Sequence, residues 1–265
     1  DGNITSGFFG ATASNSPSGI VNNYGVEVGM NVGKQMKDFF FNVNAQLAFA
    51  RNKIVNMNEA FKPYDYLKST GRRLGQFYGL EAIGFFKDQA DINNSPIQTF
   101  STVYPGDLKY KDQNGDGIIT SEDRTVIGNT LPKWYGGITN TFDYKGIDFS
   151  FMLQFNYGND IYNATRLYST QSRNGRRNML AEVADRWSPT NTSNLVPSQD
   201  GYIVNDVYSR FIEDGSFLRL KNITLGYTLP HKWTRKFHAS KLRIYATGQN
   251  LFCISGYSGY DPEVN

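Results

Sequence analysis

Two runs of eleven residues, 39–49 and 147–157, alternate between apolar and polar side chains almost without interruption. In the first run, Phe41 and Val43 share one face, and Asn42 lies on the other. Alternation of period two predicts β-strands, because successive side chains of a strand point to opposite faces. Strands of soluble proteins commonly have about 5–6 residues, whereas tilted strands that cross a bilayer need about 9–11. These runs are therefore long enough to span a membrane.

Four further segments follow the same alternation less cleanly. They are residues 24–32, 134–144, 217–229 and 242–252. Together, the six segments predict an all-β chain of antiparallel strands. The strongest apolar stripes end in aromatic residues, as do the lipid-facing stripes of membrane barrels, which carry aromatic girdles at both interfaces.

The two faces of the strands indicate which medium each one meets. The polar faces carry Asn, Gln, Thr, Ser and Gly with few Lys or Glu, and charged residues make up only 19% of the chain, against about 25% in typical proteins. An enclosed, wet lumen accommodates such side chains. The residues expected to face lipid are Phe41, Val43, Leu47, Phe149, Phe151, Leu153 and Phe155, and those expected to face the lumen are Asn42, Asn44, Gln46, Ser150 and Gln154. Alternation alone leaves a large soluble β-sandwich or barrel as the alternative.

Composition excludes several kinds of protein. The 27 Lys and Arg against 24 Asp and Glu give a net charge of +3, too close to neutral for a strongly basic nucleic-acid binder. Aromatic residues make up 15% of the chain, too many for a disordered one. The one cysteine, Cys253, allows neither an intrachain disulfide nor a cysteine-based zinc site. The chain contains no phosphate-binding loop, GxSxG elbow or HExxH pattern, and we expect no catalytic residue.

The connections between the predicted strands alternate in length. Those at 33–38, 145–146 and 230–240 are short, whereas those at about 51–133 and 158–216 are long. Bacterial outer-membrane barrels alternate in this way, with short periplasmic turns and longer extracellular loops. Such barrels have an even strand number of at least 8 and begin and end in the periplasm. Six strands are too few to close one, so we expect a C-terminal barrel fragment that lacks earlier strands and one final strand.

Residues 112–123 read D-x-N-x-D-G-x-I-x-x-x-D, close to the calcium loop of EF-hands and dockerins. In such a loop, side chains at positions 1, 3 and 5, a carbonyl at position 7 and a carboxylate at position 12 surround the cation. The predicted ligands are Asp112, Asn114, Asp116, the carbonyl of Ile118, and Asp123, with Ile119 as the apolar anchor of the loop. Oxygen ligands without nearby Cys or His favour Ca²⁺ as a structural ion. The alternative is a metal-free turn closed by side-chain hydrogen bonds to the backbone.

Aromatic residues in the second long connection are candidate ligand contacts. Met179, Val183 and Trp187 recur at helical spacing, which predicts a short surface helix. Tyr162, Tyr168 and Trp187 could stack against a sugar ring, and equally could be packing residues.

A series of short segments carries a family resemblance. They are residues 23–27, 49–54, 71–76, 105–110, 124–129, 216–227 and 245–251. Each segment alone is a weak signal, but together they span most of the chain in a fixed order. On these segments, the sequence resembles the SusC/RagA-like TonB-dependent transporters of Bacteroidetes outer membranes.

The resemblance implies that residues 1–265 are the C-terminal part of a transmembrane β-barrel of 22 strands, with about six spanning strands and a calcium-type loop at 106–124 within an extracellular loop. It implies import of oligosaccharides or peptides across the bacterial outer membrane. The implied partners are a SusD-like surface lipoprotein, TonB acting through an absent N-terminal region, the plug and other strands of the same transporter, and outer-membrane lipid.

Two other functions need different features. A soluble carbohydrate-binding β-protein with a dockerin-like calcium loop needs a charged, solvated strand face, and the polar faces here carry little charge. An outer-membrane lipase or protease needs a base beside a nucleophile, but His231 and His238 both lie in one predicted periplasmic turn. The sequence therefore favours the transporter and predicts no enzyme.

Overall fold

The computed structural model describes residues 19–100, 102–170, 178–192, 195–198 and 207–263. The chain forms two compact units. The sheet unit comprises residues 24–50, 131–160 and 214–265, and the loop unit comprises residues 1–23, 51–130 and 161–213. Within the described residues, no helix combines the length and the apolar character needed to cross a bilayer.

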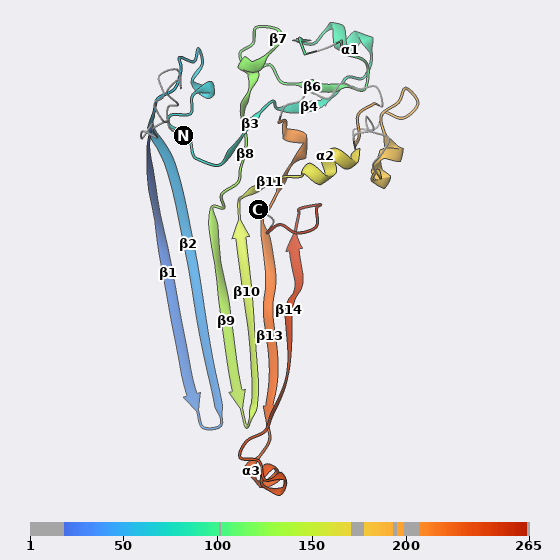
Figure 1. Cartoon of the computed structure of the whole chain (residues 1–265). Coiled ribbons are helices and arrows are strands. Elements are labelled where there is room, and N and C mark those ends of the chain that lie inside the picture. The colour runs from blue at the N-terminus through green and yellow to red at the C-terminus, as the bar shows by residue number, and fades with distance from the viewer. Residues whose placement is uncertain (1–18, 101, 171–177, 193–194, 199–206, 264–265) are drawn as a thin grey trace, which may run out of the picture. The chain divides into compact units, whose positions relative to one another are not determined.

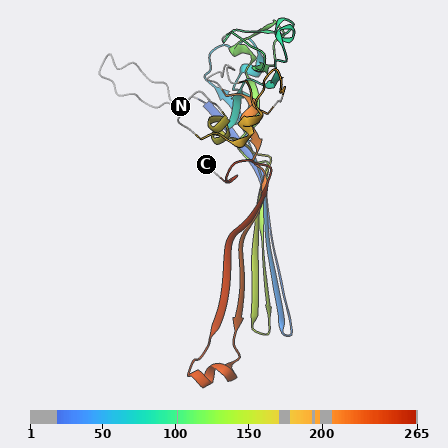
Figure 2. The ribbon, with the colours of Figure 1, turned by 90° about the vertical axis from the view of Figure 1, so that its right-hand side faces the viewer.

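Six long strands form the sheet unit (Figure 1). Their order across the sheet follows the chain: β1 (Gly19–Met36), β2 (Phe39–Met57), β9 (Trp134–Tyr144), β10 (Ile147–Tyr157), β13 (Phe217–Thr228) and β14 (Arg243–Ser255). Pairing from β2 to β14 is antiparallel throughout. The predicted all-β fold and all six predicted strands are confirmed. Figure 2 shows the sheet as a single curved layer, which is open rather than closed into a barrel.

Short connections join the strands at one end of the sheet. β9 and β10 meet at Lys145 and Gly146, whose φ values of 48° and 87° match the twist of a two-residue hairpin turn. β1 and β2 are joined by Lys37 and Asp38 alone, fewer residues than the predicted turn at 33–38, because both strands continue to the turn. Between β13 and β14 lie α3 (His231–Thr234) and the 3₁₀ helix η6 (Arg235–Phe237), at the same end (Figure 1).

The pairing register separates a polar from an apolar face. One row of the polar face consists of Asn42, Thr141, Ser150, Thr224 and Thr247. The neighbouring row on the apolar face consists of Phe41, Phe142, Phe149, Leu225 and Ala246. The ring of Phe142 lies 6.2 Å from that of Phe149 and 6.4 Å from that of Phe151. The alternation predicted for single strands therefore continues across the sheet.

The apolar face of the sheet is not the site of the hydrophobic core. Leu225, Ile244 and Ile254 on this face remain 54%, 63% and 63% exposed. The buried hydrophobic cluster among the described residues consists instead of Leu80, Phe85, Leu108, Tyr110, Ile119, Trp187, Tyr208 and Phe211, all in the loop unit. Soluble β-proteins bury the apolar face of a sheet against a second layer. The exposed face is instead the surface expected of a sheet that meets lipid.

A β-bulge keeps the apolar side chains of β13 on one face. Leu218 and Leu220 occupy even positions, whereas Ile223 and Leu225 occupy odd ones, so a regular strand would place the two pairs on opposite faces. The register shifts between Leu220 and Asn222, and the inserted Lys221 absorbs the change.

The loop unit contains short elements. Its strands pair as β3 (Gln76–Gly79) with β8 (Thr125–Asn129), β4 (Ala82–Phe85) with β6 (Leu108–Tyr110), and β5 (Ile97–Gln98) with β7 (Ile118–Ile119). β11 (Asp160–Tyr162) pairs with β12 (Ile212–Asp214). The helices are α1 (Gln89–Asn93), α2 (Ala164–Thr170), and the 3₁₀ turns η2 (Asp65–Leu67), η3 (Ser121–Asp123), η4 (Ala181–Asp185) and η5 (Ser209–Phe211). The helix predicted around Val183 is reduced to η4, because Arg186 is extended and bridges Val196.

Phe151→Arg should lower the free energy of unfolding of the whole protein in a bilayer by about 2–4 kcal/mol, because Phe151 lies near the middle of β10 on the apolar face. Denaturant titration in phospholipid vesicles measures this change. Ser150→Arg, which adds the same charge on the polar face, should have a much smaller effect. Equal losses in the two variants would contradict the assignment of the faces.

Candidate functional site

The loop at 112–123 is closed by hydrogen bonds to its own side chains. The carboxylate of Asp112 accepts from the backbone N–H groups of Gly115 and Gly117 at 2.6 and 2.8 Å. The carboxylate of Asp116 accepts from the N–H of Ile118 at 2.7 Å. Gly115 and Gly117 have φ values of 77° and 82°, which glycine adopts without steric cost.

Two buried residues fix this loop to the rest of its unit. Ile119 is fully buried in the hydrophobic cluster, which confirms its predicted role as the anchor. The carboxylate of Asp123, also fully buried, accepts from the backbone N–H groups of Gln113 at 2.8 Å and Thr120 at 2.7 Å. Asp123 therefore holds the two halves of the loop together.

The predicted metal ligands carry suitable oxygens that also bind the backbone of the loop. Burial raises the pKa of Asp112, but hydrogen bonds from Gly117 and Gly115 outweigh it, so the pKa lies below its ordinary value and the carboxylate is charged at neutral pH. Within the described ranges, no group of three or more His, Cys, Asp or Glu side chains is arranged to hold a metal ion. Calcium binding by Asp112, Asn114, Asp116, the carbonyl of Ile118, and Asp123 stays a prediction.

The three aromatic candidates differ in exposure. Trp187 is only 6% exposed and covers Gly106, where a Cβ atom would lie 2.3 Å from the indole ring. Tyr162 packs against the same cluster, 6.2 Å from the ring of Phe77, and burial raises its pKa. Tyr168 is 53% exposed. Trp187 and Tyr162 thus contribute to packing, and ring stacking by any of the three stays a prediction.

An open cavity of about 590 Å³ lies beside Trp187 in the loop unit. It is lined by Tyr104, Pro105, Arg186, Trp187, Ser188, Pro189 and Ser198. The buried carboxylate of Asp107 accepts from the N–H of Tyr104 at 2.8 Å and thus positions one wall. The volume lies within the range of about 300–1,000 Å³ for small-ligand pockets. Apart from Trp187, sequence patterns did not reveal these residues, because some eighty positions separate the two walls.

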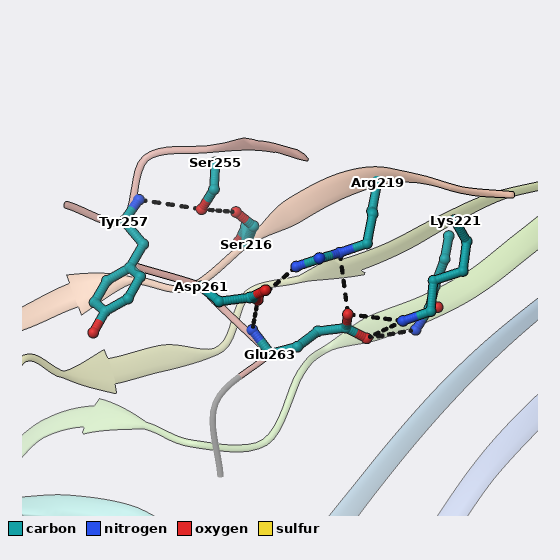
Figure 3. Close-up of polar contacts among 8 residues, drawn as sticks. Ser216, Arg219, Lys221, Ser255, Tyr257, Asp261 and Glu263 are labelled. Atoms are coloured by element: carbon teal, nitrogen blue, oxygen red, sulfur yellow. Dashed lines mark hydrogen bonds and ion pairs between the residues drawn. The ribbon is translucent and has the colours of Figure 1, made fainter. Parts of the chain in front are cut away.

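A charged cluster on the polar face holds the segment after β14 against the sheet (Figure 3). Arg219 forms ion pairs with Asp261 at 2.5 Å and with Glu263 at 3.1 Å, and Lys221 forms one with Glu263 at 2.9 Å. The amide of Gln154, predicted to face the lumen, donates to Glu263 at 3.2 Å. Arg219 is 5% exposed, so this pairing compensates a buried charge. The cluster thereby fixes the path of residues 256–263.

No pattern in the sequence revealed this charged cluster. Arg219 and Lys221 look like ordinary polar positions on either side of Leu220. Only the bulge at Lys221 and the return of the chain after β14 bring their cations to Glu263. The change of parity between Leu220 and Ile223 was the available signal for the bulge, but not for the partner.

Glu263→Gln should loosen residues 256–263 without unfolding the sheet, because it removes the charge shared by Arg219 and Lys221. Backbone hydrogen exchange in this segment should become about fivefold faster, the factor that corresponds to about 1 kcal/mol for a partly exposed pair. Glu27→Gln, which neutralises an exposed carboxylate of β1, is the matched control. Unchanged exchange in Glu263→Gln would contradict the clamping role.

The same clamp should resist acid. Hydrogen bonding by Arg219 holds the pKa of Asp261 below its ordinary value of 3.8. A carboxylate with a lowered folded pKa contributes its full stabilisation above the unfolded pKa and loses it as the pH falls through the folded one. Residues 256–263 should therefore keep their slow exchange down to about pH 4 and lose it only at lower pH. Loss of protection between pH 5 and pH 7 would contradict this assignment.

In comparisons with known proteins, the chain matches parts of much longer receptors. No protein-family model matches it. TonB-dependent receptor P26 of Formosa agariphila is 33% identical over 258 residues, which cover 92% of this chain and 26% of that protein. TonB-dependent receptor P3 of the same organism is 34% identical over 195 residues, which cover 74% of this chain and 19% of that protein. TonB-dependent receptor SusC of Bacteroides thetaiotaomicron is 28% identical over 259 residues, which cover 93% of this chain and 24% of that protein.

Solved structures agree on the fold. A structure of the RagAB peptide transporter matches 98% of this chain and 28% of its own, with a TM-score of 0.76 and 21% identity. The RagAB peptide importer in its "closed-closed" state matches with a TM-score of 0.72 and 21% identity. This match covers 98% of this chain and 29% of the importer chain. This chain spans about a quarter of the length of the curated relatives that it matches.

Proposed function

We propose, because this chain belongs to the SusC-like TonB-dependent receptors, that it forms part of the wall of an outer-membrane β-barrel that imports nutrients. The sheet carries this proposal. Its apolar face stays exposed, while the hydrophobic cluster of the described residues lies in the loop unit. Such a sheet is stable where hydrocarbon covers the apolar face and water wets the polar one.

The strands have the length that this arrangement requires. β9 and β10 have eleven residues each, and at about 3.4 Å per residue such a strand reaches roughly 35 Å. A tilted strand needs about 9–11 residues to cross the hydrocarbon core. On the proposed barrel wall, Gln154, Arg219 and the clamped segment after β14 would line the lumen and narrow it beside β13.

Membership of this family supports further proposals about the position of the chain in the barrel, its partners and its cargo. We infer that residues 1–265 are the C-terminal part of the barrel, with the loop at 106–124 on the extracellular side. The partners proposed are a SusD-like lipoprotein, TonB, the plug and remaining strands, and outer-membrane lipid. The cargo class proposed is oligosaccharides or peptides, and the neighbouring solved structures are titled a peptide transporter and a peptide importer. The named relatives are receptors and transporters, and the soluble carbohydrate-binding alternative is not favoured.

Cysteine labelling of the intact receptor in outer-membrane vesicles tests the proposal. In a Cys253→Ser background, Asn42→Cys and Ser150→Cys should react with a membrane-impermeant maleimide once the lumen is accessible, because both residues lie on the polar face. Val43→Cys and Phe149→Cys, one position away, should react at least tenfold more slowly. Equal reactivity of neighbouring positions would reject a membrane-spanning sheet.

We further propose that the loop at 112–123 binds Ca²⁺ and thereby stiffens residues 106–124. The oxygen-only ligand set, the position of Gly117 and the charged state of Asp112 support this proposal. Asp116→Ala should weaken Ca²⁺ binding at least tenfold in calorimetry and remove the protection that Ca²⁺ gives the loop against proteolysis. Asp65→Ala, an exposed aspartate elsewhere in the loop unit, is the control. Identical proteolysis of the unmodified loop with Ca²⁺ and with chelator would contradict the proposal.

A further inference from the structure

Six cations that form no ion pair with any described residue lie at the turn end of the sheet unit. They are Lys34, Lys37, Lys232, Arg235, Lys236 and Lys241, called the basic turn cluster here. All six are exposed, and no ion pair joins any of them to an acid in the part of the chain that the structure describes. α3 and η6, which carry three of them, lie beyond the ends of β13 and β14 (Figures 1 and 2).

Other cations of the sheet unit have partners. Lys145 pairs with Asp38 at 3.7 Å, and Nε of Arg243 donates to Asp148 at 2.9 Å. At the opposite end of the strands, Arg219 and Lys221 share Asp261 and Glu263. Asp38 and Asp148 are thus engaged by Lys145 and Arg243, and the charge of Asp143 acts on Arg243 as well. The six remaining cations leave the turn end with a net positive surface.

One cation of the cluster lies on the apolar face itself. The amide of Asn42 donates to Asn31 at 2.9 Å, which places Asn31 on the polar face. Alternation along β1 then places Val32 and Lys34 on the apolar face, with Lys34 two residues before the end of the strand. A lysine at this position can lay its alkyl chain along hydrocarbon and extend its ammonium group to the head groups. On the proposed barrel wall, Lys34 would lie at the level where the bilayer ends.

Aromatic residues mark the same level. Tyr144 at the end of β9 is 48% exposed and Tyr227 near the end of β13 is 36% exposed, whereas Trp233, which is 55% exposed, lies beyond the strand ends in α3. Trp and Tyr gather at bilayer interfaces because their rings are apolar and their N–H and O–H groups are polar. The basic turn cluster therefore borders the apolar face at the level of the lipid head groups.

We propose that the basic turn cluster, with Trp233, binds anionic phospholipid head groups in the leaflet at the turn end of the barrel. This inference rests on the proposed function, since only a sheet that spans a bilayer brings head groups to this level. Lys34 favours lipid over an acidic protein as the occupant, because its position on the apolar face adjoins hydrocarbon. Phosphate groups supply the negative charge that balances the surplus of cations at the turn end.

The test uses the intact receptor in phosphatidylethanolamine bilayers with and without phosphatidylglycerol. The retained lipid is quantified after extraction in mild detergent. The unmodified receptor should retain phosphatidylglycerol above its share in the bilayer. In the triple variant Lys232→Gln, Arg235→Gln, Lys236→Gln, its affinity should fall roughly a hundredfold, or about fivefold for each charge removed. Adding Trp233→Ala to this triple variant should weaken the retention of phosphatidylglycerol further.

A matched triple variant controls for total charge. Lys53→Gln, Lys62→Gln, Lys87→Gln removes three exposed lysines of the loop unit and should leave lipid retention unchanged. Equal losses in the two triple variants, or no preference of the unmodified receptor for phosphatidylglycerol, would overturn the inference. Insertion is scored separately by labelling of Asn42→Cys. A receptor that does not insert contradicts the proposed function, whereas one that inserts without lipid preference contradicts only this inference.

Discussion

The register between neighbouring strands is the constraint on which this structure depends. Side chains alternate with a period of two, so a slip of one residue would move every apolar side chain of a strand to the polar face. The rows that contain Phe142 and Thr141 remain uniform across the sheet because β9, β10 and β2 pair without a shift. Where the sequence changes parity in β13, Lys221 forms a bulge and restores the match.

The distribution of hydrophobic residues follows from this constraint. On the proposed barrel wall, lipid would cover the apolar face of the sheet, so the sheet would gain no stability from an internal core. The long connections lack such cover and must bury their own apolar residues. They do so around Leu80, Tyr110, Ile119 and Tyr208, of which Tyr110 and Tyr208 meet edge to face at 6.0 Å. The chain therefore combines a sheet whose apolar face stays exposed with long connections that fold around a small core of their own.

Charges divide between the two ends of the sheet. Near the long connections, the buried guanidinium of Arg219 requires its carboxylate partners, since an uncompensated charge at 5% exposure would be strongly destabilising. At the turn end, Lys232 and Lys236 are exposed and need no partner in the protein. The same residue types thus serve as a structural clamp at one end and as a charged surface at the other.

Local patterns in the sequence determined the strands, their two faces and the turn at Lys145 and Gly146, because alternation and turn chemistry depend on neighbouring residues alone. The segment-by-segment resemblance likewise identified the family. The anchor role of Ile119 followed from its position after Gly117 in a short motif. Only the tertiary structure decided that Trp187 is buried over Gly106, that Glu263 joins Arg219 and Lys221, and that a cavity opens between Tyr104 and Arg186. These contacts join residues 42 to 82 positions apart, and no periodicity in a single sequence encodes which distant side chain will meet another.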